Sequence, residues 1–160
     1  MSNISWIQIG QGFISIGHIP GGKISFTSLK EAGTSVVVTL LQEHEGVRKI
    51  GEQLKQMNIE WIWFPFSATN PHSGKKKTRE VLELFSNMNE LLENGNRIYI
   101  HCSAGIHRTG MITYGLLRYL GKEKEQAIQL LNMLRVVTVS SVGENRLIWG
   151  DQFFHKIPDA

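Results

Sequence analysis

The apolar positions follow a period of two near the start of the chain, and further on they form short continuous runs. Residues 6–9 and 13–16 alternate between apolar and polar side chains around a glycine-containing turn, which predicts a β-hairpin. Residues 36–41 are rich in β-branched and apolar side chains, and residues 61–64 and 97–100 are also short apolar runs. These three segments have the length and composition of buried strands.

Between these runs the apolar positions recur at helical spacing. Residues 46–57 place Val47, Ile50, Leu54 and Met57 three and four positions apart, which gives one apolar helix face. The other predicted helices span residues 25–32, 78–92, 111–120 and 125–135, with a last helix that starts at a capping box in residues 141–144 and includes Phe153 and Phe154. Strands that alternate with helices predict an α/β fold, with a mostly parallel, twisted central sheet of about 4–5 strands and helices on both faces. We expect residues 1–160 to form a single domain.

The only cysteine of the chain follows the last predicted strand and begins a loop of small residues. Ala104 and Gly105 let this loop curl so that backbone N–H groups converge above the sulfur of Cys102, a geometry that binds anions. Arg108 supplies a planar fork of donors suited to phosphoryl oxygens. Thr109 places a hydroxyl where it can donate to the sulfur. The stretch therefore predicts a thiolate nucleophile that faces a phosphate group.

Residues 101–110 resemble the His-Cys-x5-Arg-Ser/Thr signature of the cysteine-dependent protein tyrosine and dual-specificity phosphatases. The resemblance implies that Cys102 is the nucleophile, that Arg108 binds phosphate and the transition state, and that His101 and Thr109 orient and stabilise the sulfur. It also implies a mechanism without cofactor or metal. The implied phosphate-binding loop consists of Ser103, Ala104, Gly105, Ile106 and His107. His107 departs from the family pattern, which usually has glycine there.

The family also uses a loop aspartate as general acid, and this chain departs from that pattern. Residues 64–72 resemble the acid loop of the phosphatase and tensin homologue group, an aromatic-Pro-Phe-x-Asp-x-Asn-Pro pattern, and Ala68 occupies the aspartate position. A methyl group cannot donate a proton, and general acid catalysis contributes about 10² to 10⁴ in rate. Three accounts stay open. The chain is an engineered substrate-trapping variant, a natural enzyme with another proton source or a better leaving group, or a phosphate-binding relative without turnover.

Other polar residues offer weaker candidates for the chemistry. His72 and His107 can titrate near neutral pH, and we interpret them as an exposed turn residue and a wall residue of the loop. Asp151 is interpreted as a charge on the surface of the last helix. The residues that could position a hydrolytic water are Thr138, Asn145 and Gln152. No spacing in the sequence selects one of them.

The charge pattern indicates acidic partners. The formal net charge is +3, and Lys75, Lys76 and Lys77 follow the acid-loop segment at the start of a predicted helix. These lysines form either a solvated face or a surface that steers a polyanionic substrate. The expected partner is a phosphorylated protein or another phosphate monoester, including inositol phosphates and lipids. The sequence carries no specific nucleic-acid signal.

Composition removes several classes of protein. A hydrophobic content of 41% with 19% charged residues is typical of a globular domain, and a single cysteine cannot form an internal disulfide. No apolar run reaches the roughly 18 residues of a membrane span, and the start of the sequence lacks a secretory signal. We therefore expect a cytoplasmic protein, with a secreted effector as the alternative. Rival functions are a phospho-ligand binding module and a redox-sensing thiol, although no second cysteine is present to resolve an oxidised one.

Overall fold

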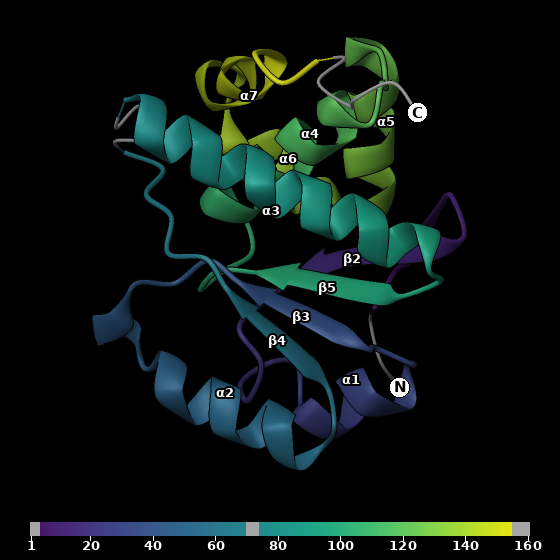
Figure 1. The fold of residues 1–160 in the computed structure, drawn as a ribbon, viewed down its shortest axis with the longest axis vertical. Coiled ribbons are helices and arrows are strands. Elements are labelled where there is room, and N and C mark those ends of the chain that lie inside the picture. Colours follow the sequence, from purple (N-terminus) through teal and green to yellow (C-terminus); the bar gives the residue numbers. More distant parts are fainter. Residues whose placement is uncertain (1–3, 70–73, 155–160) are drawn as a thin grey trace.

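The computed structural model describes residues 4–69 and 74–154. A five-stranded sheet lies at the centre of the fold, with helices above and below it (Figure 1). Its strands are β1 (Ile7–Ile9), β2 (Gly12–Gly17), β3 (Val36–Thr39), β4 (Glu60–Trp63) and β5 (Arg97–His101). The helices are α1 (Phe26–Glu31), the 3₁₀ turn η1 (Glu43–Glu45), α2 (Val47–Gln56), α3 (Lys75–Glu93), α4 (His107–Tyr119), α5 (Lys124–Leu134), α6 (Val136–Val142) and α7 (Glu144–Asp151).

The order of the strands places β5 in the middle of the sheet. The order is β1-β2-β5-β3-β4, and only β1 runs antiparallel to its neighbour. Helices α1 and α2 cover one face of the sheet, and α3 to α7 cover the other (Figure 1). The predicted α/β class, the mostly parallel sheet and the helices on both faces are confirmed. A loop that leaves the carboxyl end of β5 lies at the edge of the sheet where such folds bind ligands.

Helix α4 is the most deeply buried helix because most residues between its two charged ends are apolar or small. It contacts β5 and the three helices that follow it. Thr109 to Leu117 are all buried, so the helix is packed on every side from its third residue onward. An element packed in this way holds its first turn in one position.

One predicted strand boundary changed at the carboxyl end of the sheet. The strand predicted at residues 36–41 ends at Thr39, because its partner β5 ends at His101 and the Leu40 N–H makes the last backbone bond, to the His101 carbonyl. Leu40 and Leu41 are fully buried beyond the strand end. The turn η1, which the sequence did not predict, follows directly.

Three helices differ from their predicted bounds. Helix α3 begins at Lys75 instead of residue 78, and α4 begins at His107 instead of residue 111, because polar residues of the first turns add nothing to the apolar period. The predicted capping box at residues 141–144 is wrong: Ser141 lies inside α6, and Gly143 separates the two helices with a φ of 87°. Helix α7 also ends at Asp151, before Phe153 and Phe154.

Within the described segments, no helix combines the length and the apolar character needed to cross a membrane.

The contact between α7 and α4 gives a test of the packing. A Cβ atom added to Gly150 would lie 2.7 Å from Cδ2 of Tyr114 and 3.0 Å from the backbone of Gly115. Overpacking of this kind destabilises the folded state by about 1–3 kcal/mol. This exceeds the stabilisation of about 0.5–1 kcal/mol that alanine gives relative to glycine within a helix. Gly150→Ala should therefore lower the free energy of unfolding, measured by urea denaturation.

The control lies in the same helix. Ile148 is 51% exposed, so Ile148→Ala should change the free energy of unfolding little. Equal stability of Gly150→Ala and the unaltered protein would show that α7 can move away from α4.

Candidate active site

The cysteine occupies the junction between the central strand and the most buried helix. Cys102 follows β5 directly, and its side chain is 3% exposed. Residues 103–106 form the loop, and α4 begins at His107. The Thr109 hydroxyl, in the first turn of α4, donates to Cys102 Sγ at 3.1 Å. The structure thus brings the sulfur, the hydroxyl and the N-terminus of α4 together, an arrangement in which negative charge on sulfur is stabilised.

The loop is held from its outer side by residues near the end of α5 and in α6. Arg135 Nη1 donates to the carbonyl oxygens of Ala104 at 2.6 Å and Gly105 at 3.1 Å, and the Thr138 hydroxyl donates to the Gly105 carbonyl at 2.6 Å. Gly105 has a φ of 72° and lies directly against the Gly17 carbonyl, so no side chain fits there. Four donor–acceptor and packing contacts therefore fix the shape of the loop.

The three residues predicted as candidates to position a water lie in different surroundings. The Thr138 hydroxyl is fully buried and engaged with the loop carbonyl, so Thr138 supports the loop. Asn145 is exposed on α7, and the Gln152 amide donates to the Trp149 carbonyl. Sequence reasoning missed Arg135, because nothing in its local pattern separates it from a helix-terminal arginine.

A carboxylate that the sequence did not indicate holds the arginine of the loop. Arg108 Nη1 lies 2.7 Å from Glu45 Oε1, and Nη2 lies 3.0 Å from Oε2, which is the two-pronged geometry of strong pairs. The hydrogen bond from Arg108 lowers the pKa of Glu45, and the same bond raises the pKa of Arg108. Arg108 also lies 3.4 Å from the Ser103 hydroxyl. The guanidinium is therefore oriented before any ligand arrives.

His101 is fully buried between the sheet and the loop. Its Nδ1 lies 2.8 Å from the Cys102 carbonyl oxygen and its Nε2 lies 2.7 Å from the Thr39 hydroxyl. Because a carbonyl only accepts, Nδ1 carries the proton and Nε2 accepts from Thr39, whose oxygen in turn accepts from Trp61 Nε1 at 2.8 Å. Burial lowers the pKa of His101 to about 4, so the ring is neutral at pH 7. As a neutral ring it orients the cysteine backbone through its hydrogen bond.

Ala68 faces the loop across a small cleft. The cleft has a volume of about 240 Å³, and its lining consists of Gln42, Phe66, Ser67, Ala68, Thr69, His107 and Arg108. The structure therefore brings Ala68, the exposed His107 and Arg108 to one opening. His72 lies outside the described residues.

The segment that carries Ala68 is anchored at several points. Phe66 is buried and packs on Trp149 with ring centroids 5.1 Å apart, and Gln42 Nε2 donates to the Phe66 carbonyl at 3.1 Å. Lys77 Nζ donates to the Pro65 carbonyl at 2.8 Å and lies 4.5 Å from the centre of the Phe64 ring. Of the three predicted steering lysines, Lys77 therefore holds this segment, while Lys75 and Lys76 are exposed at the start of α3.

Asp151, at the end of α7, is hydrogen-bonded to two residues of α4. Its Oδ1 accepts from the Tyr114 hydroxyl and from Arg118 Nε at 3.0 Å. Asp151 is the last residue of α7, and its partly exposed carboxylate is paired with Arg118. Among residues 4–69 and 74–154, no group of three or more histidine, cysteine or acidic side chains is placed to hold a metal ion.

Comparison with known proteins gives a consistent set of relatives. A family described as Tc-R-P, polymorphic toxin system, DSP-PTPase phosphatase, matches residues 15–122. Mouse Laforin is 30% identical over 66 residues, which is 41% of this chain, and the chain spans only 19% of the length of Laforin.

Solved phosphatase structures share the fold. Kinase associated phosphatase (KAP) matches with a TM-score of 0.69 and 20% identity, over 94% of this chain and 95% of that one. PTPMT1 in complex with PI(5)P matches with a TM-score of 0.72 and 15% identity, over 92% and 93%. The fold of this chain is thus also found in solved phosphatases.

The pair of Arg108 with Glu45 predicts a pH-dependent stability. Glu45→Gln removes a charged acceptor from a guanidinium whose side chain is 17% exposed, which should cost about 1.5–3 kcal/mol at pH 7. Since the folded-state pKa of Glu45 lies below its ordinary value of 4.5, the wild-type advantage is complete above pH 4.5 and is lost as pH falls through the folded pKa. Urea unfolding at pH 7 and pH 3 measures the difference.

Glu43 on the same turn is the matched control. It pairs with Arg48 at 3.3 Å, but both side chains are mostly exposed, so Glu43→Gln should change stability by less than about 1 kcal/mol at either pH. A Glu45→Gln effect that is as small, or that does not shrink at pH 3, contradicts the assignment.

Proposed function

Because the chain belongs to the Tc-R-P family of polymorphic-toxin phosphatases of the dual-specificity and tyrosine type, we propose that it hydrolyses phosphate monoesters through a covalent phosphate intermediate on Cys102. The observation that carries the proposal is the 3.1 Å contact from the Thr109 hydroxyl to Cys102 Sγ, at the helix start that also bears Arg108. A buried structural cysteine needs neither partner. A cysteine that attacks as a thiolate in one step and departs as a thiolate in the next needs both.

The reaction proceeds in two displacements. The Cys102 thiolate attacks phosphorus, the S–P bond forms, and the P–O bond to the leaving group breaks, so that group departs with the electron pair and takes up a proton. Water then attacks the cysteinyl-phosphate, releases inorganic phosphate and restores the thiolate. In both steps Arg108 and the loop amides stabilise the charge on the equatorial oxygens.

The supporting residues divide these tasks. The Thr109 hydroxyl donates to sulfur when Cys102 is the leaving group in the second step. Neutral His101 fixes the cysteine backbone through its Nδ1–H, and Glu45 holds Arg108 in the orientation that meets two phosphoryl oxygens. Each of these contacts exists before substrate binds, which is the preorganisation that electrostatic catalysis requires.

Ala68 sets the limit on rate. With a methyl group at the aligned aspartate position, the leaving oxygen takes its proton from water or from His107, whose imidazole lines the cleft. Esters with poor leaving groups are then cleaved slowly, while binding is retained. This holds whether Ala68 is natural or an engineered trapping substitution.

A second candidate function rests on Ala68. A phospho-ligand binding module without turnover needs the loop and Arg108 but no proton donor, and Ala68 fits that description. Such a module binds vanadate or a phosphopeptide, yet shows no phosphate release that disappears in Cys102→Ser.

The substrate class proposed is a phosphate monoester on a protein or on an inositol ring. Exposed Lys75 and Lys76 and the formal net charge of +3 support an anionic substrate. The PI(5)P complex of PTPMT1 shows that a related fold accepts an inositol phosphate lipid.

Restoring the carboxylate tests the catalytic assignment. Ala68→Asp should raise the turnover of phenyl phosphate by about 10² or more, because the leaving phenoxide then receives a proton from a positioned acid. The gain should shrink for aryl phosphates with more acidic leaving groups, measured as kcat across a series of substituted phenols.

Two outcomes would contradict parts of the catalytic proposal. A gain well under tenfold that is equal for every leaving group overturns the placement of the acid at residue 68. Phosphate release that persists in the Ala68→Asp, Cys102→Ser double variant contradicts the covalent mechanism.

Steering by the lysines is tested by charge removal. The double variant Lys75→Ala, Lys76→Ala should raise KM for an inositol phosphate several-fold at low salt and weaken its salt dependence, with kcat unchanged. Lys49→Ala together with Lys55→Ala on α2 removes the same charge and is the control. Equal KM values for the two double variants refute steering.

A further inference from the structure

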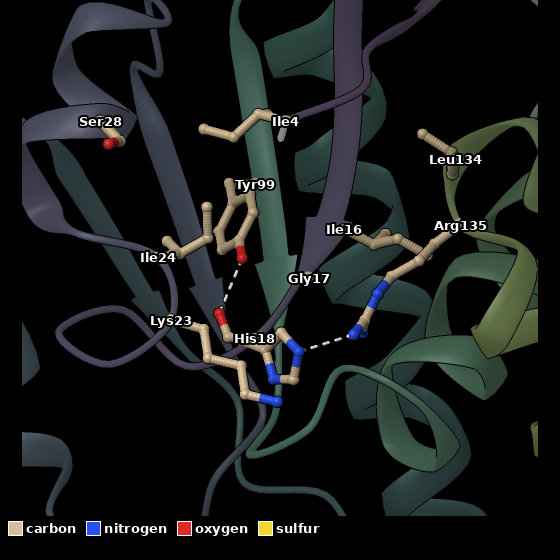
Figure 2. A pocket seen from close by; sticks show the side chains of 10 residues that line it. All are labelled: Ile4, Ile16, Gly17, His18, Lys23, Ile24, Ser28, Tyr99, Leu134 and Arg135. Atoms are coloured by element: carbon tan, nitrogen blue, oxygen red, sulfur yellow. Dashed lines mark hydrogen bonds between the residues drawn. The ribbon is translucent and has the colours of Figure 1, made fainter. Parts of the chain in front are cut away.

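A second cavity lies next to Arg135, the residue that is bonded to the carbonyls of the catalytic loop. It has a volume of about 320 Å³, and its lining consists of Ile4, Ile16, Gly17, His18, Lys23, Ile24, Ser28, Tyr99, Leu134 and Arg135. In Figure 2 the side chains of His18 and Lys23 and the guanidinium of Arg135 gather at one end, beyond the Tyr99 hydroxyl, and Ile4 and Ser28 lie at the other. The cavity is thus basic at one end, while isoleucine, leucine and tyrosine side chains line part of the rest.

The basic end carries unbalanced positive charge. No acidic residue lines the cavity, and within the described residues neither Lys23 nor Arg135 forms an ion pair. The partners of Arg135 are the two loop carbonyls and His18 Nε2, at 2.8 Å, all of them neutral acceptors. Burial, Arg135 and Lys23 lower the pKa of His18, so its ring stays neutral and accepts from the guanidinium. Two cations therefore converge without a counter-ion.

We propose that this cavity is a second anion site, which binds a phosphate group separately from the catalytic loop and acts on that loop through Arg135. Phosphate monoesters carry about −1.5 to −2 charges at pH 7, which matches the two cations. Lys23 provides a point charge at the mouth, and the neighbouring Ile24 side chain and Tyr99 ring offer a wall for the carbon skeleton that carries the phosphate. The phosphate belongs either to a second position on the substrate or to a separate effector.

The coupling to the loop follows from shared contacts. Arg135 uses one nitrogen for the loop carbonyls and the other for His18, so a ligand that binds beside it changes the field on the loop. The His18 segment is also bonded to the loop directly, since the Ile19 N–H donates to the Ser103 carbonyl at 3.0 Å. The Tyr99 hydroxyl donates to the His18 carbonyl at 2.7 Å and fixes the cavity wall.

Binding is tested with inorganic phosphate and a variant that reverses the charge. In the Cys102→Ser protein, phosphate titration followed by NMR should give two saturation curves, one at the amides of Ile106 and Thr109 and one at those of Ile24 and Ser28. Lys23→Glu should weaken the second curve at least tenfold and shift the first by much less. Lys49→Glu, which makes the same charge change on exposed α2, should leave both curves unchanged.

This readout is independent of catalysis, so it stands even if the proposed turnover fails. A single curve with one midpoint at all four amides, or a second curve that Lys23→Glu leaves unchanged, overturns the site.

Kinetics of the active protein identify the source of the phosphate. If the second phosphate belongs to the substrate, Lys23→Glu raises KM for an inositol bisphosphate several-fold and leaves KM for an aryl phosphate unchanged. If it belongs to an effector, added sulfate changes kcat for the aryl phosphate in the unaltered protein and not in Lys23→Glu. Should Lys23→Glu and Lys49→Glu behave alike in both measurements, the coupling to the loop is wrong.

Discussion

A buried chain of hydrogen bonds connects three neighbouring strands to the backbone of the cysteine. It runs from Trp61 on β4 through Thr39 on β3 to His101 on β5, and ends at the Cys102 carbonyl. The chain works only while His101 is neutral and in one tautomer, which burial secures. The position of the sulfur therefore depends on the register of the sheet. A shift of β3 or β4 by one residue relative to β5 would break this series of hydrogen bonds.

The opposite side of the site is held by charge. Arg108 and Glu45 lie far apart in sequence, yet their pairing fixes the guanidinium at the cleft, while Arg135 fixes the loop from behind. Only one of the two arginines has a carboxylate partner within the described residues. This asymmetry leaves the rear of the loop more cationic than its front, and the second anion site is proposed for that side.

The sequence was sufficient for features that repeat locally or occur as a contiguous motif. Strands β3 and β5, helix α2 and the loop around Cys102 followed from apolar period and from the spacing of Cys102 and Arg108. Helix α6 was missed because its run of valine, threonine and serine favours strands, and only burial of Thr138 and Val142 against α4 makes it helical. Glu45 was missed because a pair 63 residues apart exists only in the folded chain.

The anchoring of the Ala68 segment has a consequence for how the cleft meets its ligand. With Phe66 buried against Trp149 and the carbonyls of Pro65 and Phe66 bonded to Lys77 and Gln42, this wall belongs to the hydrophobic core. A wall built in this way is ordered when the chain folds, so little conformational entropy is lost when a phosphoester enters. The ligand should then bind a preformed cleft, and its association rate constant should be governed by diffusion and charge, without a conformational change of this segment.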